Sequence, residues 1–432
     1  MEVKPGYKMT EVGVIPEDWR IVSVGQAGQV LGGKQRSPHA QGESSKYLRV
    51  ANVYDGYIDC DDVFEMPFSG SEKERFLLRE GDVLLNEGQS IDLVGRSAVY
   101  RGVPEDCCFQ NTLLRFRACR ETNVSFAQLI FQDFLKRGIF SSIALQTTSI
   151  AHLGAGRFSS LKMQLPPLPE QEAIASALSD VDALIESLEQ LLAKKRNIKQ
   201  GAMQELLTGK RRLPRFQIVH GYKHTEVGII PVDWEIQELG NVLESIQLGG
   251  NYKATERQTD LPLVKMGNMG RGNILLNKLQ YIEQSNTAAD QDLLRVGDLL
   301  LNTRNTPELV GKVSMWRGEL PVAYFNSNIM RLEFKRSKVY SNEFMNHLLN
   351  TSTFVRYLRE IAIGTTSVAA IYGRDLVKLK VPLPAKAEQA AIAGVLSDMN
   401  EEISGLEEKL AKARHLKQAM MQELLTGRIR LV

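Results

Sequence analysis

The sequence contains little cysteine, no long apolar run and almost no excess of charge. Only four of its 432 residues are cysteine, and none forms a Cys-x-x-Cys pair, which argues against the common zinc-binding and disulfide-rich frameworks. No run of about 18 apolar residues is present to span a bilayer. The N-terminal MEVKPGYKMTEVG also lacks the apolar stretch of a secretory signal. We therefore expect a cytoplasmic protein with free thiols and no membrane partner.

The charge balance leaves the class of partner open. The chain has 53 Lys and Arg residues against 51 Asp and Glu residues, a net charge of +2. This value neither requires nor excludes a nucleic-acid partner. Local basic patches must hold such a partner if it exists.

Signatures of catalysis are missing as well. No NPPY-like or DPPY-like tetrapeptide of an adenine methyltransferase is present, and no GxGxxG follows a strand-like run. The segment nearest to a P-loop is GQVLGGKQ (28–35), where Gln35 replaces the Ser or Thr that would bind magnesium. Glu333 and Lys335 have the spacing of a nuclease E-x-K pair but no identifiable partner aspartate. We interpret them as the end of a strand.

What the sequence does contain is a copy of itself. MQELLTGK (203–210) recurs as MQELLTGR (421–428), and GYKMTEVGVIPEDW (6–19) recurs as GYKHTEVGIIPVDW (221–234). LREGDVLLN and TTSIA likewise recur, in order, as LRVGDLLLN and TTSVA. The separation grows only from 215 positions (221 − 6) to 218 (421 − 203). Each half is therefore one ancestral unit copied whole, too long for a solenoid repeat.

The first zone of each half, 1–165 and 213–383, predicts a mixed α+β globule. It contains short β-like runs separated by Gly, Asn and Asp, and one helical stretch of about twenty residues. The β-like runs are YLRVANV, GDVLLN, SAVYRG and LLRFRA in copy one, and PLVKMGN, GDLLLN, VSMWRG and IMRLEF in copy two.

The second zone, 166–212 and 384–432, predicts a long helix in each half. Residues 170–208 contain no proline and one glycine, and apolar residues recur at alternating spacings of four and three. Pro169 suits the first helical turn and Gly209 suits the C-cap. The predicted coiled-coil seam consists of Ile174, Leu178, Val181, Ile185, Leu188 and Leu192, and of Ile392, Leu396, Met399, Ile403, Leu406 and Leu410.

The order of the segments favours an antiparallel pair of helices. The second globule begins almost directly after the first helix ends. A parallel pair would require this globule to carry the chain back over the whole helix, about 60 Å. Burial of the seam side chains favours pairing over isolated helices. We therefore expect a pseudo-two-fold molecule in which two long antiparallel helices separate two globules.

Several of these segments resemble the specificity subunit of Type I restriction–modification enzymes. The resemblance rests on LPPLPEQEAIASALSDVD, on the long helix that ends in LLTGK, and on the TEVGVIPEDW segment near the start of each half. It covers essentially the whole chain, in both copies. Copy two reads VPLPAKAEQ, so Ala387 replaces Pro169, which leaves the start of the second helix open by a few residues.

The resemblance implies a DNA-reading protein with no catalytic centre. Each globule would be a target recognition domain that reads one half of an asymmetric, bipartite site in double-stranded DNA. The helices would set the spacer and dock two methyltransferase (modification) subunits, and restriction/translocase subunits would complete the enzyme. No cofactor is expected here, since S-adenosylmethionine, ATP and Mg would be bound only in partner subunits. The implied segments are target recognition domain 1 (1–165), long helix 1 (166–212), target recognition domain 2 (213–383) and long helix 2 (384–432).

The copies differ most in polar loops, as expected if each reads a different half-site. LGGKQRSPHAQGESSK (31–46) stands opposite QLGGNYKATERQTD (247–260), and NEGQSID (86–92) stands opposite NTRNTPE (302–308). Such side chains bind phosphates and the edges of bases, although exposed loops also diverge without function. The candidate DNA-binding residues in these loops are Lys34, Arg36, Gln89, Asn251, Lys253, Arg257, Arg304 and Asn305.

A Thr-Thr-Ser segment recurs unchanged and cannot supply differences between half-sites. Its residues either bind backbone phosphate or cap a following helix. Arg115 and Arg331 also recur, in predicted strands, as structural or phosphate-facing residues. The Thr-Thr-Ser candidates are Thr147, Thr148 and Ser149 in copy one and Thr365, Thr366 and Ser367 in copy two.

Two alternatives to DNA reading stay open at this point. The first is a coiled-coil scaffold that binds proteins only, because the basic stretches AKKRNIKQ (193–200) and AKARHLKQ (411–418) on the helices suit a protein partner, spacer DNA or solvent. The second is a self-contained DNA-modifying enzyme, which the missing motifs disfavour. If the helices act as a ruler, a four-residue turn inserted near 206–209 should lengthen the preferred spacer.

Overall fold

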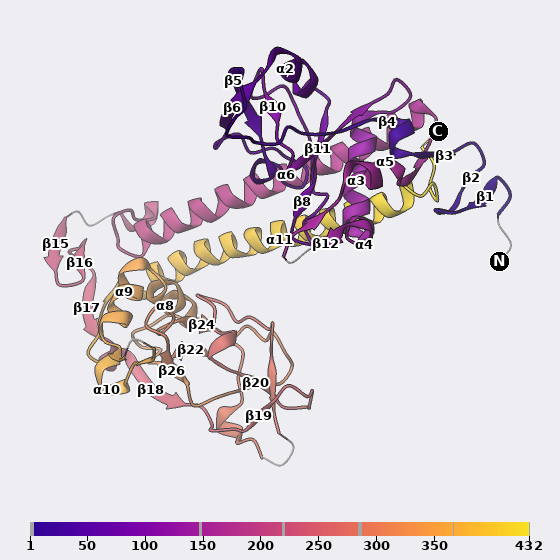
Figure 1. Cartoon of the computed structure of the whole chain (residues 1–432). Helices are drawn as coiled ribbons and strands as arrows, with labels where there is room; N and C mark the ends of the chain where they lie inside the picture. Colours follow the sequence, from indigo (N-terminus) through magenta and orange to yellow (C-terminus); the bar gives the residue numbers. More distant parts are fainter. Residues whose placement is uncertain (1–3, 147–148, 218–220, 284–286, 366, 432) are drawn as a thin grey trace. The chain divides into compact units, whose positions relative to one another are not determined.

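The chain folds into two compact units. The computed structural model describes all residues except 1–3, 147–148, 218–220, 284–286, 366 and 432. The first unit contains residues 1–189 and 409–432, and the second contains residues 190–408. Each unit therefore combines one globule with parts of both long helices (Figure 1). In the part of the chain that is described, no helix is long and apolar enough to cross a membrane.

A four-stranded antiparallel sheet forms the centre of the first globule, in the order β4–β11–β7–β9. Helices α3 and α4 supply aromatic rings to its core. Phe131 of α3 lies edge-on to Phe116 of β11, with 5.1 Å between ring centroids, and Phe134 of α3 lies edge-on to Phe140 of α4, with 5.8 Å between ring centroids. Each such pair contributes about 0.5–1.5 kcal/mol beyond its burial. The elements are β4 (Gly28–Gly32), β7 (Val83–Asn86), β9 (Ser97–Val99), β11 (Leu113–Ala118), α3 (Val124–Lys136) and α4 (Ile139–Ile143).

Smaller sheets complete the first globule. They are the hairpin β1 (Tyr7–Thr10)–β2 (Gly13–Pro16), the pair β3 (Arg20–Ser23)–β14 (Lys162–Leu165), the sheet β10 (Cys108–Phe109)–β5 (Glu43–Leu48)–β6 (Phe64–Phe68), and the sheet β12 (Leu145–Gln146)–β13 (Ala151–His152)–β8 (Gly88–Gln89). The short helices are α1 (Val24–Ala27), α2 (Gly70–Phe76), α5 (Ala155–Ser160) and a 3-10 turn at Val50–Asn52.

The cysteines of the first globule are free thiols, as expected. Cys107 and Cys108 are buried in a second core under β5 and β6. Burial raises the pKa of Cys107 to about 12 and that of Cys108 to about 11. Both thiols therefore stay protonated at neutral pH and act as small apolar side chains.

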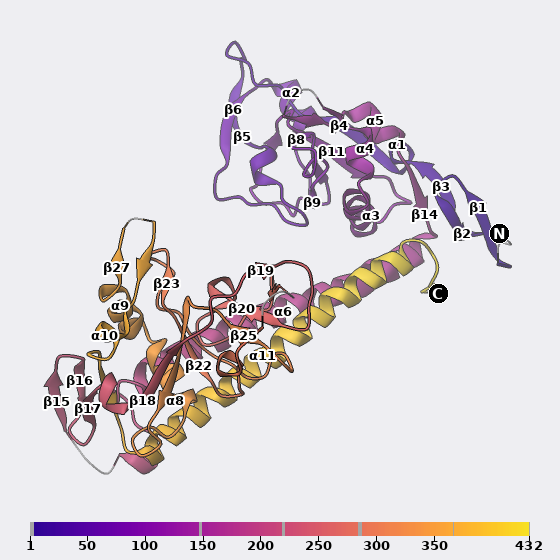
Figure 2. The ribbon, with the colours of Figure 1, turned by 90° about the horizontal axis from the view of Figure 1, so that it is seen from below.

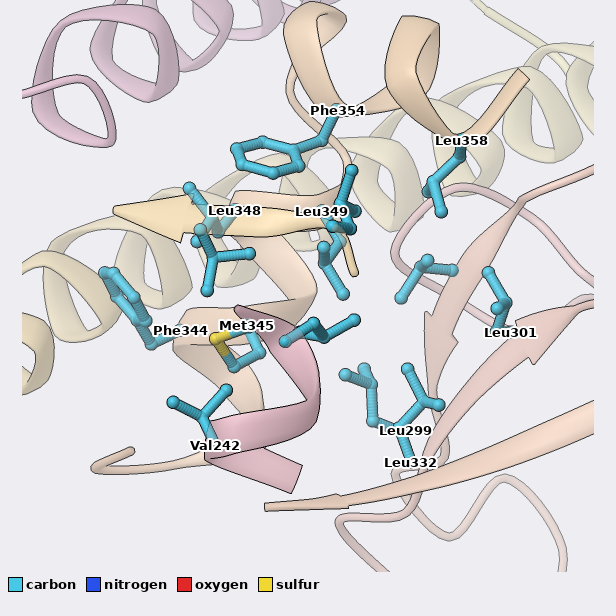
Figure 3. Close-up of a cluster of buried hydrophobic side chains, with 14 of the residues drawn as sticks. Val242, Leu299, Leu301, Leu332, Phe344, Met345, Leu348, Leu349, Phe354 and Leu358 are labelled. Atoms are coloured by element: carbon cyan, nitrogen blue, oxygen red, sulfur yellow. The ribbon is translucent and has the colours of Figure 1, made fainter. Parts of the chain in front are cut away.

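The second globule repeats this plan. Its central antiparallel sheet has the order β18–β26–β22–β24. Figure 3 shows Phe344, Met345 and Leu348 of α8 gathered with Leu299 and Leu332 of the sheet in one buried cluster. The elements are β18 (Leu243–Leu248), β22 (Leu299–Asn302), β24 (Val313–Met315), β26 (Ile329–Phe334), α8 (Asn342–Leu349) and α9 (Ser352–Glu360).

The remaining elements of the second globule also follow the first, with one larger sheet. The sheets are β15 (Tyr222–Thr225)–β16 (Gly228–Pro231), β17 (Glu235–Glu238)–β29 (Lys380–Leu383), β19 (Ala254–Thr255)–β21 (Gln280–Ile282)–β20 (Pro262–Val264)–β25 (Tyr324–Phe325), and β23 (Arg304–Asn305)–β28 (Ala369–Ala370)–β27 (Ile363–Gly364). The short helices are α7 (Leu239–Val242) and α10 (Gly373–Leu376), with 3-10 turns at Pro214–Phe216, Met266–Asn268 and Asp290–Asp292.

The predicted mixed α+β globules are confirmed, but each predicted helical stretch is divided in two. In the first globule the break falls at Gly138, whose φ of 70° lies in the left-handed region that glycine adopts most readily. In the second globule α8 ends at Leu349 and α9 starts at Ser352. Apolar periodicity continues across both breaks, which is why the sequence alone suggests one helix.

The two long helices begin and end at equivalent positions. Helix α6 (Leu168–Leu206) and helix α11 (Lys386–Leu424) each contain 39 residues and are separated by 218 positions (386 − 168). Ala387 therefore does not displace the start of the second helix. Packing and tertiary contacts fix this end without the proline.

Contacts within each unit give the relative direction of the helices. In the first unit, Asp182 pairs with Lys417 at 2.6 Å and Glu189 pairs with Arg414 at 2.6 Å, so residue numbers rise along α6 as they fall along α11. In the second unit, the end of α6 at Leu206 shares a core with the start of α11. The predicted antiparallel pairing is confirmed, and Figure 1 shows the two helices running side by side.

The predicted seam is most deeply buried toward its ends. There, Ile174 and Leu178 join the first core together with Met421, and Ile392 and Leu396 join the second core. The ends of the seam therefore pack against globules as well as against the facing helix. Buried members are Ile174, Leu178, Leu192, Ile392, Leu396, Leu406 and Leu410, and half-buried members are Val181, Ile185, Leu188, Met399 and Ile403.

An arginine after α11 ties the first unit together. The Arg430 guanidinium donates to both carboxylate oxygens of Glu170, at 2.6 and 2.8 Å, near the start of α6. It also donates to Asp18, and the Trp19 indole N–H donates to Glu170 at 2.9 Å. Nearby, Tyr7 donates to the carbonyl of Gly427 at 3.0 Å, so both ends of the chain lie in this unit (Figure 1).

The second unit contains the same arrangement, built from the segment after α6. Arg212 donates to both carboxylate oxygens of Glu388, at 2.8 and 2.6 Å, and to Asp233. The Trp234 indole N–H donates to Glu388 at 3.2 Å. We call each Arg–Glu–Trp–Asp set a clamp. Because 430 − 212 and 388 − 170 both equal 218, the clamp is part of the duplicated unit.

Candidate nucleic-acid interface

Two of the predicted segments of the first globule meet in one small sheet. Strand β7 leads almost directly into β8, where Gln89 lies opposite Ala151 of β13. Strand β13 is one arm of the β12–β13 hairpin, and Ser149 lies between its two strands in the chain. Ser149 is exposed, and so are the apolar side chains of Leu145 and Ile150 beside it.

The second globule brings the same segments together. Arg304 and Asn305 of β23 lie opposite Ala370 and Ala369 of β28, and the β27–β28 hairpin carries Thr365 and Ser367. Figure 2 shows β23 and β27 at the same end of this globule. The Arg304 side chain is exposed, while Asn305 donates to the Asn302 side chain at 3.2 Å.

The long polar loops lie next to these hairpins. In the first globule, the N–H of Asn111 donates to the carbonyl of Lys34 at 3.0 Å, and the N–H of Glu87 donates to the carbonyl of Thr112 at 2.9 Å. A single short segment thus joins the 31–46 loop to the β8 strand.

The corresponding segment of the second globule does the same. The N–H of Ser327 donates to the carbonyl of Gly250 at 2.9 Å, and the N–H of Thr303 donates to the carbonyl of Asn328 at 2.9 Å. In each globule, the two loops that differ most between the copies and the hairpin that recurs in both therefore border one connected surface, which we call the candidate interface.

The loop residues differ in how free their side chains are. Arg36, Asn251 and Arg257 are exposed. Lys253 is exposed but pairs with Glu283 at 3.1 Å. Its neighbour Tyr252 anchors the loop by donating to Asp292 at 2.6 Å, and burial raises the pKa of this tyrosine.

Lys34 lies inside the protein. Its ammonium group donates to Glu72 at 2.6 Å and to the carbonyl of Pro67 at 2.8 Å, and its side chain is only 8% exposed. A lysine held in this way cannot reach a DNA backbone without breaking both bonds. We therefore leave Lys34 out of the proposed interface, although its backbone supports the loop.

This ion pair predicts an acid-sensitive contact. The hydrogen bond from Lys34 lowers the pKa of Glu72 from 4.5 to about 2. Because the pKa is lower in the folded state, the contact stabilises the fold above the unfolded-state pKa and is lost as the pH falls from 4.5 toward about 2. Glu72→Gln should flatten this part of the stability profile, as measured by urea unfolding between pH 5 and 2.5. The exposed Glu74→Gln is the control, and an identical slope in both variants would contradict the assignment.

The structure decides between two interpretations that the sequence left open. Arg115 is buried and donates to the carbonyls of Arg75 and Leu77, so its role is structural. Arg331 is likewise buried, and it pairs with Asp298 at 2.9 Å.

The helix-cap alternative for the Thr-Thr-Ser segments is wrong. The element that follows each segment is a strand and not a helix. This strand is β13, which pairs with β8, in the first globule and β28, which pairs with β23, in the second. Thr147, Thr148 and Thr366 lie outside the described residues. Whether any candidate binds DNA stays a prediction.

Two polar residues of the candidate interface, Glu87 and His152, were not among the residues predicted from the sequence. His152 Nδ1 lies 3.0 Å from the carboxylate of Glu87, beside Gln89 on the same small sheet. The equivalent residues of copy two are Ala370 and Thr303. The available signal was a chemical difference within otherwise matching segments, TTSIAH against TTSVAA.

Known proteins match the chain over almost its whole length. The profile of the Type I restriction modification DNA specificity domain matches it twice, at residues 16–195 and 231–413. The chain belongs to this family. It is the DNA specificity subunit of a Type I restriction–modification system, with two target recognition domains.

Individual relatives of this specificity subunit agree. It is 27% identical over 432 residues to the putative type I restriction enzyme MjaX specificity subunit of Methanocaldococcus jannaschii, covering 98% of this chain and 96% of that protein. It is 22% identical to the EcoKI specificity subunit of Escherichia coli, covering 96% and 90%. The S subunit structure from M. genitalium shares the fold, with a TM-score of 0.57 at 14% identity and coverage of 97% and 98%.

Membership of the family also fixes what this specificity subunit does not do. It is a non-catalytic part of a Type I restriction–modification complex, and S-adenosylmethionine and ATP are bound by the partner subunits. Among the residues that are described, no group of His, Cys, Asp or Glu side chains could hold a metal ion. The boundaries predicted at 165, 212 and 383 stay predictions, because the compact units divide each long helix internally.

Proposed function

We propose that each target recognition domain reads one half of a bipartite site in double-stranded DNA through its candidate interface. The supporting observation is that the two domains have matching backbones but present different side chains at equivalent small sheets, β12–β13–β8 and β23–β28–β27. The first domain presents Glu87, Gln89 and His152, and the second presents Arg304 and Asn305. Arginine, asparagine and glutamine make the bidentate contacts that distinguish guanine and adenine in the major groove. Because the two sets differ, the complete site is asymmetric.

The remaining partners follow from the same function. Two methyltransferase subunits bind the long helices, and restriction/translocase subunits complete the assembly. Helices α6 and α11 each contribute residues to both units, so their length sets the spacer between the half-sites. The interface supplies sequence recognition, and basic surfaces of the partners add to DNA affinity, since this subunit carries a net charge of only +2.

Selection from random duplex DNA tests this function. The subunit is assembled with its methyltransferase partner, and bound sequences are determined for the native chain and for Arg304→Ala. The substitution should relax one half-site, with a loss of about 1–3 kcal/mol of discrimination at the affected position, and leave the other half-site unchanged. Gln89→Ala is the matched variant and should relax only the opposite half-site.

The same selection distinguishes the alternatives. A protein-binding scaffold would assemble with the methyltransferase but select no sequence. A self-contained enzyme would modify DNA as the purified chain, given magnesium and methyl donor. Relaxation of both half-sites by Arg304→Ala would show that this residue supports the fold rather than reading bases.

A further inference from the structure

A short turn outside the predicted loops reverses its charge between the two domains. In the first domain Asn52 donates to the carbonyl of Asp59 at 3.0 Å, and in the second Asn268 donates to that of Leu275 at 2.9 Å. A backbone hydrogen bond also joins each turn to the central sheet. The N–H of Gly56 donates to the carbonyl of Ser97 at 2.9 Å, and the N–H of Gly272 donates to the carbonyl of Val313 at 2.7 Å. Within these matching frames, the residue before the glycine is aspartate in one domain and arginine in the other.

In the first domain the turn carries a carboxylate in place of this arginine. Asp55 accepts a hydrogen bond from Gln132 of α3 at 3.0 Å. The aligned neighbouring positions hold Arg96 and the uncharged Ser141. These three positions thus carry one carboxylate and one guanidinium, and their charges sum to zero.

In the second domain the same positions hold three cations. Arg271 replaces Asp55, Lys312 replaces Arg96, and Arg359 replaces Ser141. Asn350, which replaces Gln132, donates to backbone instead, at 3.0 Å from the carbonyl of Val313.

Two of these cations have no acidic partner among the described residues. The pKa of Arg271 is lowered, first by burial and then by the positive charge of Arg359. The pKa of Lys312 is lowered in the same way, first by burial and then by the positive charge of Arg271. Within the described chain, no carboxylate forms an ion pair with Arg271 or Lys312. The nearby Arg317 is neutralised by Glu343 at 2.8 Å. Like charges held together without a counter-charge destabilise the free protein and favour binding of an anion.

The cationic cluster adjoins the candidate interface. The N–H of Asn302 donates to the carbonyl of Lys312 at 2.8 Å, which closes the loop that carries Arg304. Arg359 donates to the carbonyl of Glu308 in the same loop at 2.7 Å. Hydrogen bonds from its own backbone N–H and from Thr306, and to a smaller extent the charge of Arg359, lower the pKa of the Glu308 carboxyl. Glu308 therefore partly balances this one arginine. The cluster and the base-reading strand β23 are therefore parts of one loop system.

We propose that Arg271, Lys312 and Arg359 form a phosphate-binding site for the backbone of duplex DNA, present in the second target recognition domain and absent from the first. This site rests on the proposed DNA-reading function and adds to it a difference between the two domains in how they contact DNA. The second domain holds DNA through sequence-independent contacts as well as through bases. The first domain depends more on base contacts.

Salt dependence of binding tests the site. Affinity of the assembled subunit–methyltransferase complex for its selected duplex is measured by fluorescence anisotropy over a range of KCl concentrations. Loss of one phosphate contact should reduce the slope of log K against log salt by about 0.9. We expect this reduction for Arg271→Gln and for Lys312→Gln, with equal loss of affinity on duplexes whose half-sites are matched or altered. Arg271→Lys should retain the native slope.

The first domain provides the control, since Arg96→Gln should leave the slope unchanged. An equal fall for Arg96→Gln would overturn the difference between the domains, and a native slope for Arg271→Gln would overturn the site. A native slope combined with weaker assembly would show that the surface binds protein, which also overturns the site. If the native complex selects no bipartite sequence, the proposed function itself fails.

Discussion

Replacement of Arg430 by alanine should destabilise the first unit by about 3–5 kcal/mol, because it leaves a buried carboxylate without its counter-charge. The Glu170 side chain is only 1% exposed, and Arg430 supplies two of its hydrogen bonds. The remaining bond from Trp19 is a neutral donor and cannot balance the charge. Urea unfolding monitored by tryptophan fluorescence should show the loss, and the melting temperature should fall by about 10 °C.

Matched variants separate the clamp from a general effect of charge. Arg428→Ala removes a nearby exposed arginine and should change stability by less than about 0.5 kcal/mol. Arg212→Ala should reproduce the large effect in the second unit, through Glu388. Adding Glu170→Gln to Arg430→Ala should restore part of the stability, since no buried charge then remains. Equal stability of Arg430→Ala and Arg428→Ala would disprove the role assigned to the clamp.

The clamp illustrates what the sequence can and cannot predict. The duplication and both long helices could be predicted, because matching segments and apolar spacing are local patterns. The repeated Arg212 and Arg430 are visible in the sequence as well. Their partners are not, since Arg430 pairs with a glutamate 260 positions away in the chain.

The same contrast between local patterns and long-range partners applies to the candidate interface, of which the sequence predicts only a part. Exposed loop residues such as Arg36 and Arg304 could be chosen from their composition alone. Lys34 could not be recognised as buried, because Glu72, 38 positions away, determines its surroundings. The pairing of β13 with β8 is also a long-range contact, which is why the sequence alone leaves a helix cap open as an alternative. Tertiary pairing decides such cases over local propensity.

The structure also changes where the helices can be lengthened. A four-residue insertion near 206–209 would fall in a packed region: Leu206 and Leu207 are buried in the second core. A Cβ on Gly209 would lie 2.4 Å from Pro231. Such an insertion would also move Arg212 away from Glu388 and so break the clamp. We therefore expect it to unfold part of the second unit before it lengthens any spacer.

Insertion of seven residues in both helices avoids this conflict. The sites are the unit junctions, between Glu189 and Gln190 in α6 and between Glu408 and Lys409 in α11. A heptad preserves the seam and rotates the following residues by only about 20°, whereas four residues rotate them by about 40°. Each helix lengthens by about 10 Å, which corresponds to about three base pairs of duplex. Selection from a library of spacer lengths should therefore return both native half-sites with a spacer longer by about three base pairs.

The insertion must be made in both helices because each contributes to both units. A heptad in α6 alone would displace its contacts with α11, including Asp182–Lys417, or the equivalent contacts of the second unit. This single insertion should lower the melting temperature, while the double insertion should keep it within a few degrees of the native value. A native spacer in the folded double variant would show that the methyltransferase partners, and not the helices, set the distance between half-sites. A shifted spacer places that distance in the 39-residue length of α6 and α11.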